Sequence, residues 1–574
     1  MWLVSTSLDG EVFRMKRNLS KFPGKNYDVI IIGGGIYGAC TAWYAAQQGL
    51  SVLLLEKGDF GHATSFNSQK IVHGGLRYLQ HLDFKRIFES VRETRVLRQI
   101  APNLVYPMPC VMPAYGHLLE GKEILWVAVN LFRLISLNRN RSVEARNHLP
   151  VGKIISRDDC LKLFPDLEVE GLKGGALWYD AQVYNTERLL LSFIKSAVGF
   201  GADVANYAEV TGFIFDNKRV VGVEVKDVLG GQKFRVNGRI TVNASGPWVN
   251  EVLSLIGRSH NTPEVHFIKV NLLITKPFIE GYSLGVSSRK QYIDPDAVIK
   301  KEARLLFFTP WHGYNLVGTT EQHYSGRPDD CGISEKEIDD LINDVNEAYP
   351  GADLNRKDVL FFYTGLLPGS SKCINSGQTH ILKKYSIVDH MKIDGVDGLV
   401  SVIGVKFTTA TDVARKTVGV LLGKLGRRRS VKINPDVSIW NSSAVNMEFS
   451  DYLERTLENQ KSGLDDDIVR NLVINYGSEC EKIIRYAEED PSLRGRVVGY
   501  SPVIWAELVY AIREEMAEKL SDLMLRRTQL GEAGYPGEKC MRECADFMAR
   551  EKGWDEARIK KEITEIKAIY QPLA

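Results

Sequence analysis

The stretch from Tyr27 to Glu56 constrains the fold more than any other part of this chain. It opens with a β-branched apolar run at 29–32, which predicts a buried parallel strand. Gly33, Gly35 and Gly38 follow at G-x-G-x-x-G spacing. In that pattern the first glycine permits a tight turn and the second lets the backbone approach a pyrophosphate, while the third lets a helix pack on the strand.

The residues after the glycines complete the expected order of elements. Ala39 to Gln48 predicts a helix, whose N-terminus would present N–H groups to a pyrophosphate. Val52 to Leu55 predicts a second buried strand, and it ends in Glu56, a carboxylate placed to accept hydrogen bonds from a ribose. We therefore predict a dinucleotide site, with NAD and FAD both open from the motif alone.

Length and composition limit the class of protein. A chain of 574 residues predicts two or three domains. Its net charge of +2 gives no reason to expect a nucleic-acid partner. The eight cysteines include no C-x-x-C pair, so we expect neither a zinc ribbon nor a thioredoxin-like site, and no metal. This cysteine usage favours a cytoplasmic location.

Two segments bear on membrane contact. Residues 1–26 lack the long apolar core of a secretory signal, and they form an N-terminal extension that is either disordered or packed over the dinucleotide domain. Ile124 to Leu137 is too short to span a bilayer but predicts an amphipathic helix, with Asn130, Arg133 and Ser136 on its polar face. The favoured reading is a helix packed on its own domain, and the alternative is an in-plane membrane anchor.

A second motif follows the dinucleotide fingerprint. Residues 59–84 read DFGHATSFNSQKIVHGGLRYLQHLDF. They resemble the FAD-dependent glycerol-3-phosphate dehydrogenases of the D-amino-acid-oxidase-like flavoprotein superfamily. The resemblance implies that 33–56 holds the ADP half of FAD and that 64–75 runs along the pyrophosphate and the isoalloxazine. The implied cofactor contacts here are Thr64, Ser65, Lys70 and His73.

Further matches extend the resemblance from about 27 to 545. They include GGALWYDAQVYNTER at 174–188, VNASGPWV at 242–249 with Gly246, and GLVSVIGVKFTT at 398–409 with Gly404 and Thr408. In the family this last turn lies against the flavin's pyrimidine edge. The implied fold class is α/β, with a Rossmann-like FAD-binding domain, an antiparallel-sheet substrate domain and a C-terminal α-helical domain.

Domain limits follow from the resemblance together with a direct reading of the C-terminal residues, where the helical domain begins within the basic, polar stretch 427–441. The oxidoreductase region would span 27–436, with its substrate sheet mainly at about 100–170 and 260–370, and the helical domain would span 437–574. Within that domain, Ser501 is a good N-cap and an apolar stripe recurs at helical spacing from Trp505 to Leu523. We expect one helix ending near Gly531, with Arg526 and Arg527 in its last turn, where the helix dipole favours cations.

Alcohol oxidation by flavin requires hydride transfer to N5, a base or cation for the hydroxyl group, and groups that hold the substrate. By resemblance, Arg77, Tyr78 and Lys406 match the family's catalytic positions. Arg77, Lys383 and Lys406 match positions that bind substrate. The expected activity is oxidation of a secondary alcohol, with electrons passed to a quinone-type acceptor.

The chain departs from the family where the substrate is held. The family's G-V-R-P is Gly365 to Pro368 here, so the arginine that grips phosphate is Leu367. The family's K-G-S-H is Lys269 to Leu272, so the histidine near the reacting carbon is leucine. A third arginine is Lys383, which keeps the charge without the planar fork. These changes indicate a substrate that is altered, larger or less anionic.

Three hypotheses follow from this pattern. The first is a glycerol-3-phosphate dehydrogenase passing electrons to a quinone, peripheral on the inner membrane. The second is an FAD-dependent oxidoreductase of another alcohol or amine, which Leu272 and Leu367 favour. The third, a flavin-binding protein with little catalysis, is disfavoured by the retained Arg77, Tyr78 and Lys406. We expect non-covalent FAD, and oligomeric state is left open with a homodimer as one candidate.

Overall fold

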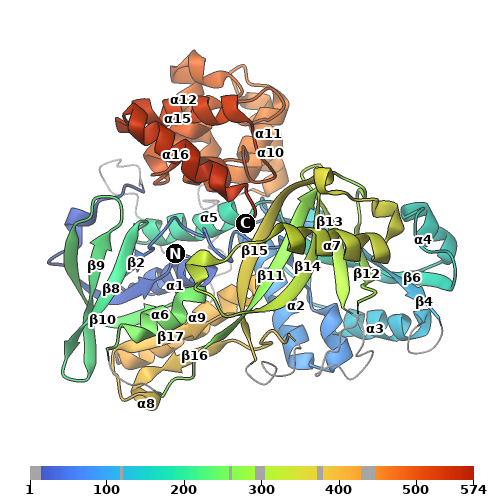
Figure 1. The fold of residues 1–574 in the computed structure, drawn as a ribbon, viewed down its shortest axis with the longest axis horizontal. Coiled ribbons are helices and arrows are strands. Elements are labelled where there is room, and N and C mark those ends of the chain that lie inside the picture. Colours follow the sequence, from blue (N-terminus) through green and yellow to red (C-terminus); the bar gives the residue numbers. More distant parts are fainter. Residues whose placement is uncertain are drawn as a thin grey trace.

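Two sheets lie side by side beneath a cap of C-terminal helices (Figure 1). The computed structural model describes residues 15–116, 121–257, 261–290, 304–370, 379–427, 439 and 447–573, with the side chain of Arg77 left out. The arrangement confirms the predicted fold class, in which a Rossmann-like domain, a substrate sheet and a helical domain follow one another in space.

The first sheet is built on the predicted fingerprint. Its central strand pairs in parallel with a neighbour on each side, and its order is β16 (Ser386–Asp389), β17 (Leu399–Ile403), β10 (Lys233–Asn243), β1 (Asn26–Ile32), β2 (Val52–Leu55) and β7 (Asp203–Ala205). A hairpin of β8 (Ala208–Asp216) and β9 (Arg219–Asp227) extends it through β10. One continuous apolar core joins this sheet to α1 (Ile36–Gln47), α5 (Thr186–Gly199) and α9 (Ala410–Lys424).

The second sheet is mostly antiparallel and carries the two leucine positions singled out above. Its order is β15 (Val359–Gly369), β11 (His266–Thr275), β14 (Tyr314–Tyr324), β13 (Leu305–Trp311), β12 (Ser283–Ser287), β4 (Val105–Tyr115), β6 (Leu172–Val183) and β3 (Ile71–Val72), with β5 (Lys153–Ile155) paired to β6. Leu272 lies on β11 and Leu367 on the adjacent β15. The helices of this half are α2 (Phe84–Ile100), α3 (Lys122–Ile135), α4 (Arg157–Leu163) and α7 (Glu335–Ala348), whereas α6 (Val249–Ser254) and α8 (His390–Ile393) lie with the first sheet (Figure 1).

The C-terminal domain corrects the expectation of one long helix. Its elements are α10 (Phe449–Asn459), α11 (Asp466–Tyr476), α12 (Cys480–Glu489), α13 (Trp505–Glu514), α14 (Leu520–Asp522), a π-helical turn (Leu523–Arg527), α15 (Glu538–Lys552) and α16 (Glu556–Ile569). The predicted stripe breaks at Met516, whose φ of +52° is left-handed. The break frees Glu515 to meet the Arg188 guanidinium at 2.6 Å, far from the helix stripe in sequence.

Arg526 and Arg527 lie in the last turn of a helical segment, as predicted. Their guanidinium groups have a partner that was not predicted, because both bind the Asp59 carboxylate, at 2.6 Å and 2.8 Å. Arg526 bonds Asp522 as well. All of these side chains are buried. The contact joins the helical cap to the loop that directly follows β2, so the cap is tied to the cofactor domain by charge.

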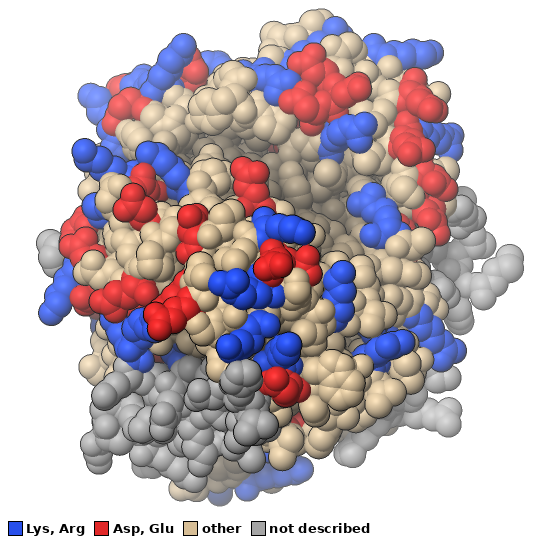
Figure 2. Space-filling model, turned by 90° about the vertical axis from the view of Figure 1, so that its right-hand side faces the viewer, with Lys and Arg blue, Asp and Glu red and all other residues tan. Residues whose placement is uncertain are grey.

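The exposed face of α3 agrees with the prediction at Arg133 but not at Ser136, and it also carries apolar side chains. Ser136, assigned to the polar face, is fully buried, whereas Trp126 is 58% exposed and Leu134 is 66% exposed. Arg133 lies on the same exposed side. Elsewhere, Lys and Arg lie beside Asp and Glu over much of the face shown in Figure 2. Among the described residues, no helix combines the length and apolarity needed to cross a membrane.

The end of the N-terminal extension, from Met15 on, packs against the dinucleotide domain. Arg17 donates to the Asn206 carbonyl at 3.0 Å and to the Asp227 carboxylate at 2.5 Å. Lys21 and Lys25 both pair with Asp203. Of the two alternatives for the extension, residues 15–26 therefore pack over the dinucleotide domain. Residues 1–14 lie outside the described residues. The domain boundary at 436/437 stays a prediction, because 428–438 also lie outside them.

Candidate functional site

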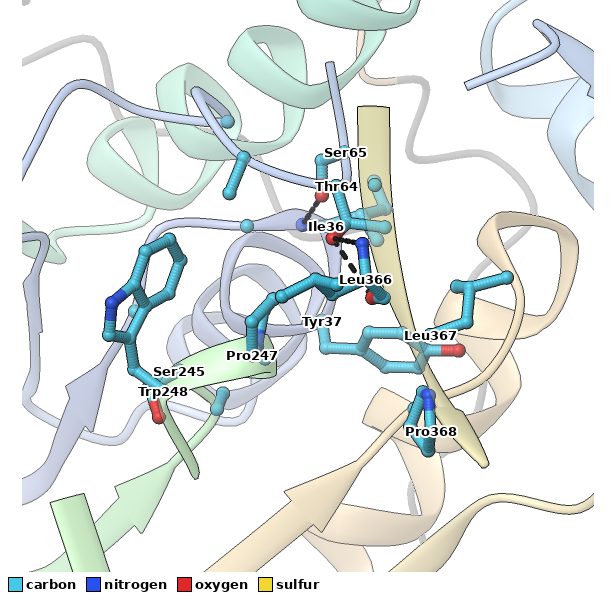
Figure 3. A pocket seen from close by; sticks show the side chains of 18 of the residues that line it. Ile36, Tyr37, Thr64, Ser65, Ser245, Pro247, Trp248, Leu366, Leu367 and Pro368 are labelled. Carbon is cyan, nitrogen blue, oxygen red and sulfur yellow. Dashed lines mark hydrogen bonds between the residues drawn. The ribbon is translucent and has the colours of Figure 1, made fainter. Parts of the chain in front are cut away.

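A cavity of about 700 Å³ opens where the carboxyl ends of β1 and β2 face β11 and β15. Figure 3 shows its wall, with Tyr37 from α1, Thr64 and Ser65 from the loop after β2, and Leu367 from β15. Ligands of open α/β sheets bind at the carboxyl ends of strands. The cavity is large enough for a dinucleotide and a small substrate.

The glycine turn forms one part of the cavity wall. Gly33 has a φ of +105°, a left-handed conformation that favours glycine. A Cβ on Gly38 would lie 1.9 Å from the Gly33 carbonyl oxygen, so α1 can approach the strand only if this residue is glycine. Gly35 lines the cavity, and a Cβ there would meet only the Ser65 hydroxyl, at 3.3 Å. The open side of Gly35 is thus the side on which a pyrophosphate would lie.

The Glu56 carboxylate is held in place by backbone donors. It accepts from the N–H of Gly34 at 2.7 Å and from the N–H of Gly58 at 2.8 Å, and it lines the cavity. Beside it, the Lys57 amine lies 4.1 Å from the centre of the Trp248 ring. The geometry fits the predicted ribose contact, since a carboxylate fixed in this way keeps lone pairs for a further hydroxyl group.

The loop after Glu56 is tied to the substrate sheet. Ser65 accepts from the N–H of Ile36 at 3.0 Å. Thr64 donates to the Leu366 carbonyl at 3.1 Å and accepts from its N–H at 3.3 Å (Figure 3). Four further predicted residues line the same cavity: His73, Gly246, Gly404 and Thr408.

Lys70 is placed differently from the prediction. It does not line the cavity, and its amine is fully buried against the Glu187 carboxylate at 2.7 Å and the Thr186 hydroxyl at 3.1 Å. The rings of Trp311 and Tyr363 lie within 5.3 Å of that amine. The sequence suggested a cofactor contact because Lys70 stands in a polar loop, and its actual partners lie more than 100 residues further along the chain. Its observed role is to anchor the loop.

A histidine–carboxylate pair lies on the cavity wall. The His73 Nδ1 is 3.1 Å from the Asp180 carboxylate, whose other oxygen accepts from the N–H of Gly74 at 2.8 Å. Asp180 is buried, while His73 is partly open to the cavity. A carboxylate at Nδ1 fixes the tautomer and leaves Nε2 as a proton acceptor. Sequence reasoning missed Asp180, although it stands in the matched segment 174–188.

Two cations flank the ring of Tyr78. The Lys406 amine lies 4.0 Å from the ring centre and the Arg86 guanidinium 4.7 Å from it. Arg86 is held by Asp83 at 2.7 Å. Burial, reinforced by repulsion from Arg86, lowers the pKa of Lys406 from 10.5 to about 7. Perturbed lysines in a cavity are candidates for proton or charge chemistry, so Tyr78 and Lys406 are brought together as predicted.

Leu272 and Leu367 both line the cavity, together with Val270, Pro368 and Ile381. Among the described side chains of the wall there is no arginine, and its only lysines are Lys57 and Lys406. Lys383 does not line it, although its charge contributes to the lowered pKa of Lys406. The side chain of Arg77 lies outside the description.

Comparisons with known proteins agree with this geometry. A family model described as FAD dependent oxidoreductase matches residues 28–410, and one described as the C-terminal domain of alpha-glycerophosphate oxidase matches 445–559. A glycerol-3-phosphate dehydrogenase of Synechocystis sp. is 34% identical over 527 residues, which are 90% of each chain. An aerobic glycerol-3-phosphate dehydrogenase of Staphylococcus epidermidis is 28% identical over 529 residues, covering 90% of this chain and 88% of that one. The structure of a glycerol-3-phosphate dehydrogenase from Bacillus halodurans complexed with FAD has the same fold, with a TM-score of 0.75 and 22% identity over 97% of this chain and 98% of that one.

Proposed function

Because this chain belongs to the FAD dependent oxidoreductase family, in its glycerol-3-phosphate dehydrogenase group, we propose that its cavity oxidises a secondary alcohol. FAD is the cofactor, and the fixed Glu56 carboxylate, the open side of Gly35 and the cavity volume fit it. When bound, FAD supplies the acceptor for the hydride. The observation that carries the proposal is that His73, Tyr78 and Lys406 line the same cavity.

Each of these residues has a role that its surroundings support. His73, oriented by Asp180, accepts the hydroxyl proton at Nε2. Lys406, held over the ring of Tyr78, stabilises the negative charge that develops on the substrate oxygen. Arg77 stays a predicted substrate contact on sequence grounds alone.

The apolar wall favours a substrate other than glycerol 3-phosphate. Leu272 and Leu367 place hydrocarbon where a phosphate dianion would need donors, and uncompensated burial of such a charge is costly. Losing one charge-assisted contact alone costs about 1.5–3 kcal/mol. We propose a secondary alcohol, or an amine of similar shape, that bears less charge at this position.

The substrate proposal is tested by anaerobic stopped-flow mixing. Glycerol 3-phosphate at millimolar concentration should bleach the flavin slowly or not at all, whereas an uncharged or less charged secondary alcohol should bleach it at enzymatic rates, about 1–1000 per second. The matched variant Leu367→Arg restores the family's fork and should speed bleaching by glycerol 3-phosphate. Fast, saturable bleaching of the wild-type flavin by glycerol 3-phosphate would contradict the substrate proposal while leaving the oxidoreductase intact.

The pKa of Lys406 predicts an alkaline limit to the reaction. Its lowered value means that the charged form persists only below about pH 7. The second-order rate constant for flavin reduction should therefore fall about tenfold per pH unit above that value. Lys406→Arg, which stays charged throughout, should keep the rate constant flat to about pH 10. The same alkaline fall in Lys406→Arg would show that another group controls it.

We further propose that the protein binds the cytoplasmic face of the inner membrane and passes electrons to a quinone there. The support is the exposed Trp126, Arg133 and Leu134 of α3, together with the exposed Leu137 and Arg141 that follow the helix. Apolar side chains at the headgroup boundary, flanked by cations, fit an anionic lipid surface.

Vesicle sedimentation tests the membrane proposal. The wild-type protein should sediment with vesicles containing anionic lipid at low salt. A Trp126→Ser, Leu134→Ser double variant should bind at least about tenfold more weakly, because full burial of each side chain contributes about 1.5–3 kcal/mol. Val228→Ser removes another exposed apolar side chain, far from α3 in sequence, and serves as the control. Equal vesicle binding by all three proteins would show that α3 does not contact the membrane.

A further inference from the structure

Tyr37 is an unexpected residue inside the glycine fingerprint. It stands directly before Gly38, in the first turn of α1, and its ring lines the cavity. Its hydroxyl oxygen accepts from the N–H of Lys406 at 2.9 Å and from the N–H of Val405 at 3.1 Å, and its proton goes to the Lys406 carbonyl at 2.6 Å. The phenol hydroxyl therefore donates one hydrogen bond and accepts two, all with backbone groups of Val405 and Lys406.

The ring is seated against that turn as closely as the hydroxyl. A Cβ on Gly404 would lie 2.0 Å from the ring of Tyr37, so glycine is required for the two to touch. The backbone carbonyl of Tyr37 in turn accepts from the Thr41 hydroxyl at 2.6 Å. The phenol therefore spans from the helix of the dinucleotide motif to the end of β17 and has little freedom to turn away.

The two backbone N–H groups that Tyr37 accepts from lie on the cavity wall, just before a helix. Val405 and Lys406 line the cavity and lead directly into the helical turn at 407–409 and α9. Unpaired N–H groups before a helix stabilise negative charge on whatever faces them. Flavin gains negative charge when it accepts an electron pair, so donors in this wall would favour its reduced form.

We propose that Tyr37 is a positioning residue that holds the N–H groups of Val405 and Lys406 away from the flavin and so weakens the stabilisation of added negative charge on the ring. The phenol satisfies both donors while remaining neutral, because burial raises its pKa to about 12. Lys406 is left as the charged group of this wall. The site's attraction for electron density is then set by a side chain that titrates near neutrality and not by fixed backbone dipoles.

Sulfite affinity of the FAD-loaded full-length protein tests this proposal without any substrate. Sulfite adds to N5 of oxidised flavin and leaves negative charge on the ring, so its dissociation constant, read from the loss of visible absorbance, reports how well the wall stabilises that charge. Tyr37→Phe keeps the ring and frees both donors. It should bind sulfite about tenfold more tightly at a fixed pH, the size expected for a hydrogen bond to a charged group.

Tyr44→Phe is the matched control. Tyr44 lies on the same helix, is fully buried and does not line the cavity, so its loss of a hydroxyl group should leave sulfite affinity unchanged. Gly404→Ala should displace the ring and tighten sulfite binding in the same direction as Tyr37→Phe. Unchanged or weaker sulfite binding by Tyr37→Phe would overturn the proposal. So would loss of FAD from that variant, because the phenol would then be holding the cofactor itself.

Discussion

Gly35→Val should abolish FAD binding while leaving the chain folded. The cavity lies on the open side of Gly35, where an added Cβ meets only the Ser65 hydroxyl at 3.3 Å. The protein itself can therefore accept a side chain there, but the pyrophosphate cannot share that space. The purified variant should be colourless and fail to take up FAD on reconstitution, with a thermal transition matching that of the wild-type apoprotein.

Gly38→Val gives the contrasting control. Its Cβ would fall 1.9 Å from the Gly33 carbonyl oxygen, inside the protein and not in the cavity, so this variant should lose fold and cofactor together. Acid precipitation of the wild-type protein should release yellow FAD into the supernatant, as expected for non-covalent binding. A yellow Gly35→Val protein would show that the cofactor does not run past this glycine.

Asp59→Asn should lower the free energy of unfolding by about 3–5 kcal/mol, the usual cost of removing one partner from a buried ion pair. The Asp59 carboxylate is fully buried between Arg526 and Arg527, and the amide would leave two guanidinium groups with one neutral acceptor. Denaturant unfolding followed by circular dichroism measures the change. Glu551→Gln, which breaks an exposed pair with Arg513, is the control and should cost less than about 1 kcal/mol.

The same pair predicts a pH dependence of stability. The two arginines hold the pKa of Asp59 well below its usual value, against the effect of burial. Its contribution to stability is therefore complete above the unfolded-state pKa of about 3.9 and is lost as the pH falls below it. The stability difference between wild type and Asp59→Asn should be constant from about pH 5 to 8 and should shrink below about pH 4. A difference that grows on acidification would contradict this assignment.

The parts of the fold that sequence could predict are those set by local rules. The strand at 29–32, the glycine turn at 33–38 and the helix after it are neighbours in sequence. Their order in space could therefore be predicted from local patterns alone. Glu56 follows from the same unit. The leucines at 272 and 367 were placed on the cavity wall by family resemblance, and the structure brings both there.

What sequence could not predict depends on partners far along the chain. Lys70 looked like a cofactor contact, yet Glu187 draws it into the interior. The periodic apolar stripe from Trp505 to Leu523 predicted one helix. In the structure the helix is interrupted between Glu514 and Leu520, where Glu515 forms a buried ion pair with Arg188. Tertiary charge pairs outweigh helical periodicity at such points. Ser136 was assigned to the exposed face of α3 but is buried, because it lies just beyond the end of the helix and periodicity does not place it.

The bond between Asp59 and Arg526 spans 467 positions of sequence. A ribosome delivers the loop that carries Asp59 early and its two arginines near the end of synthesis. Until they arrive, burying that carboxylate would cost the full desolvation of an unpaired charge. We therefore expect the loop that carries Asp59 to reach its packed arrangement only after Arg526 and Arg527 have been made. A chain that stopped before them would lack both cationic partners of this carboxylate.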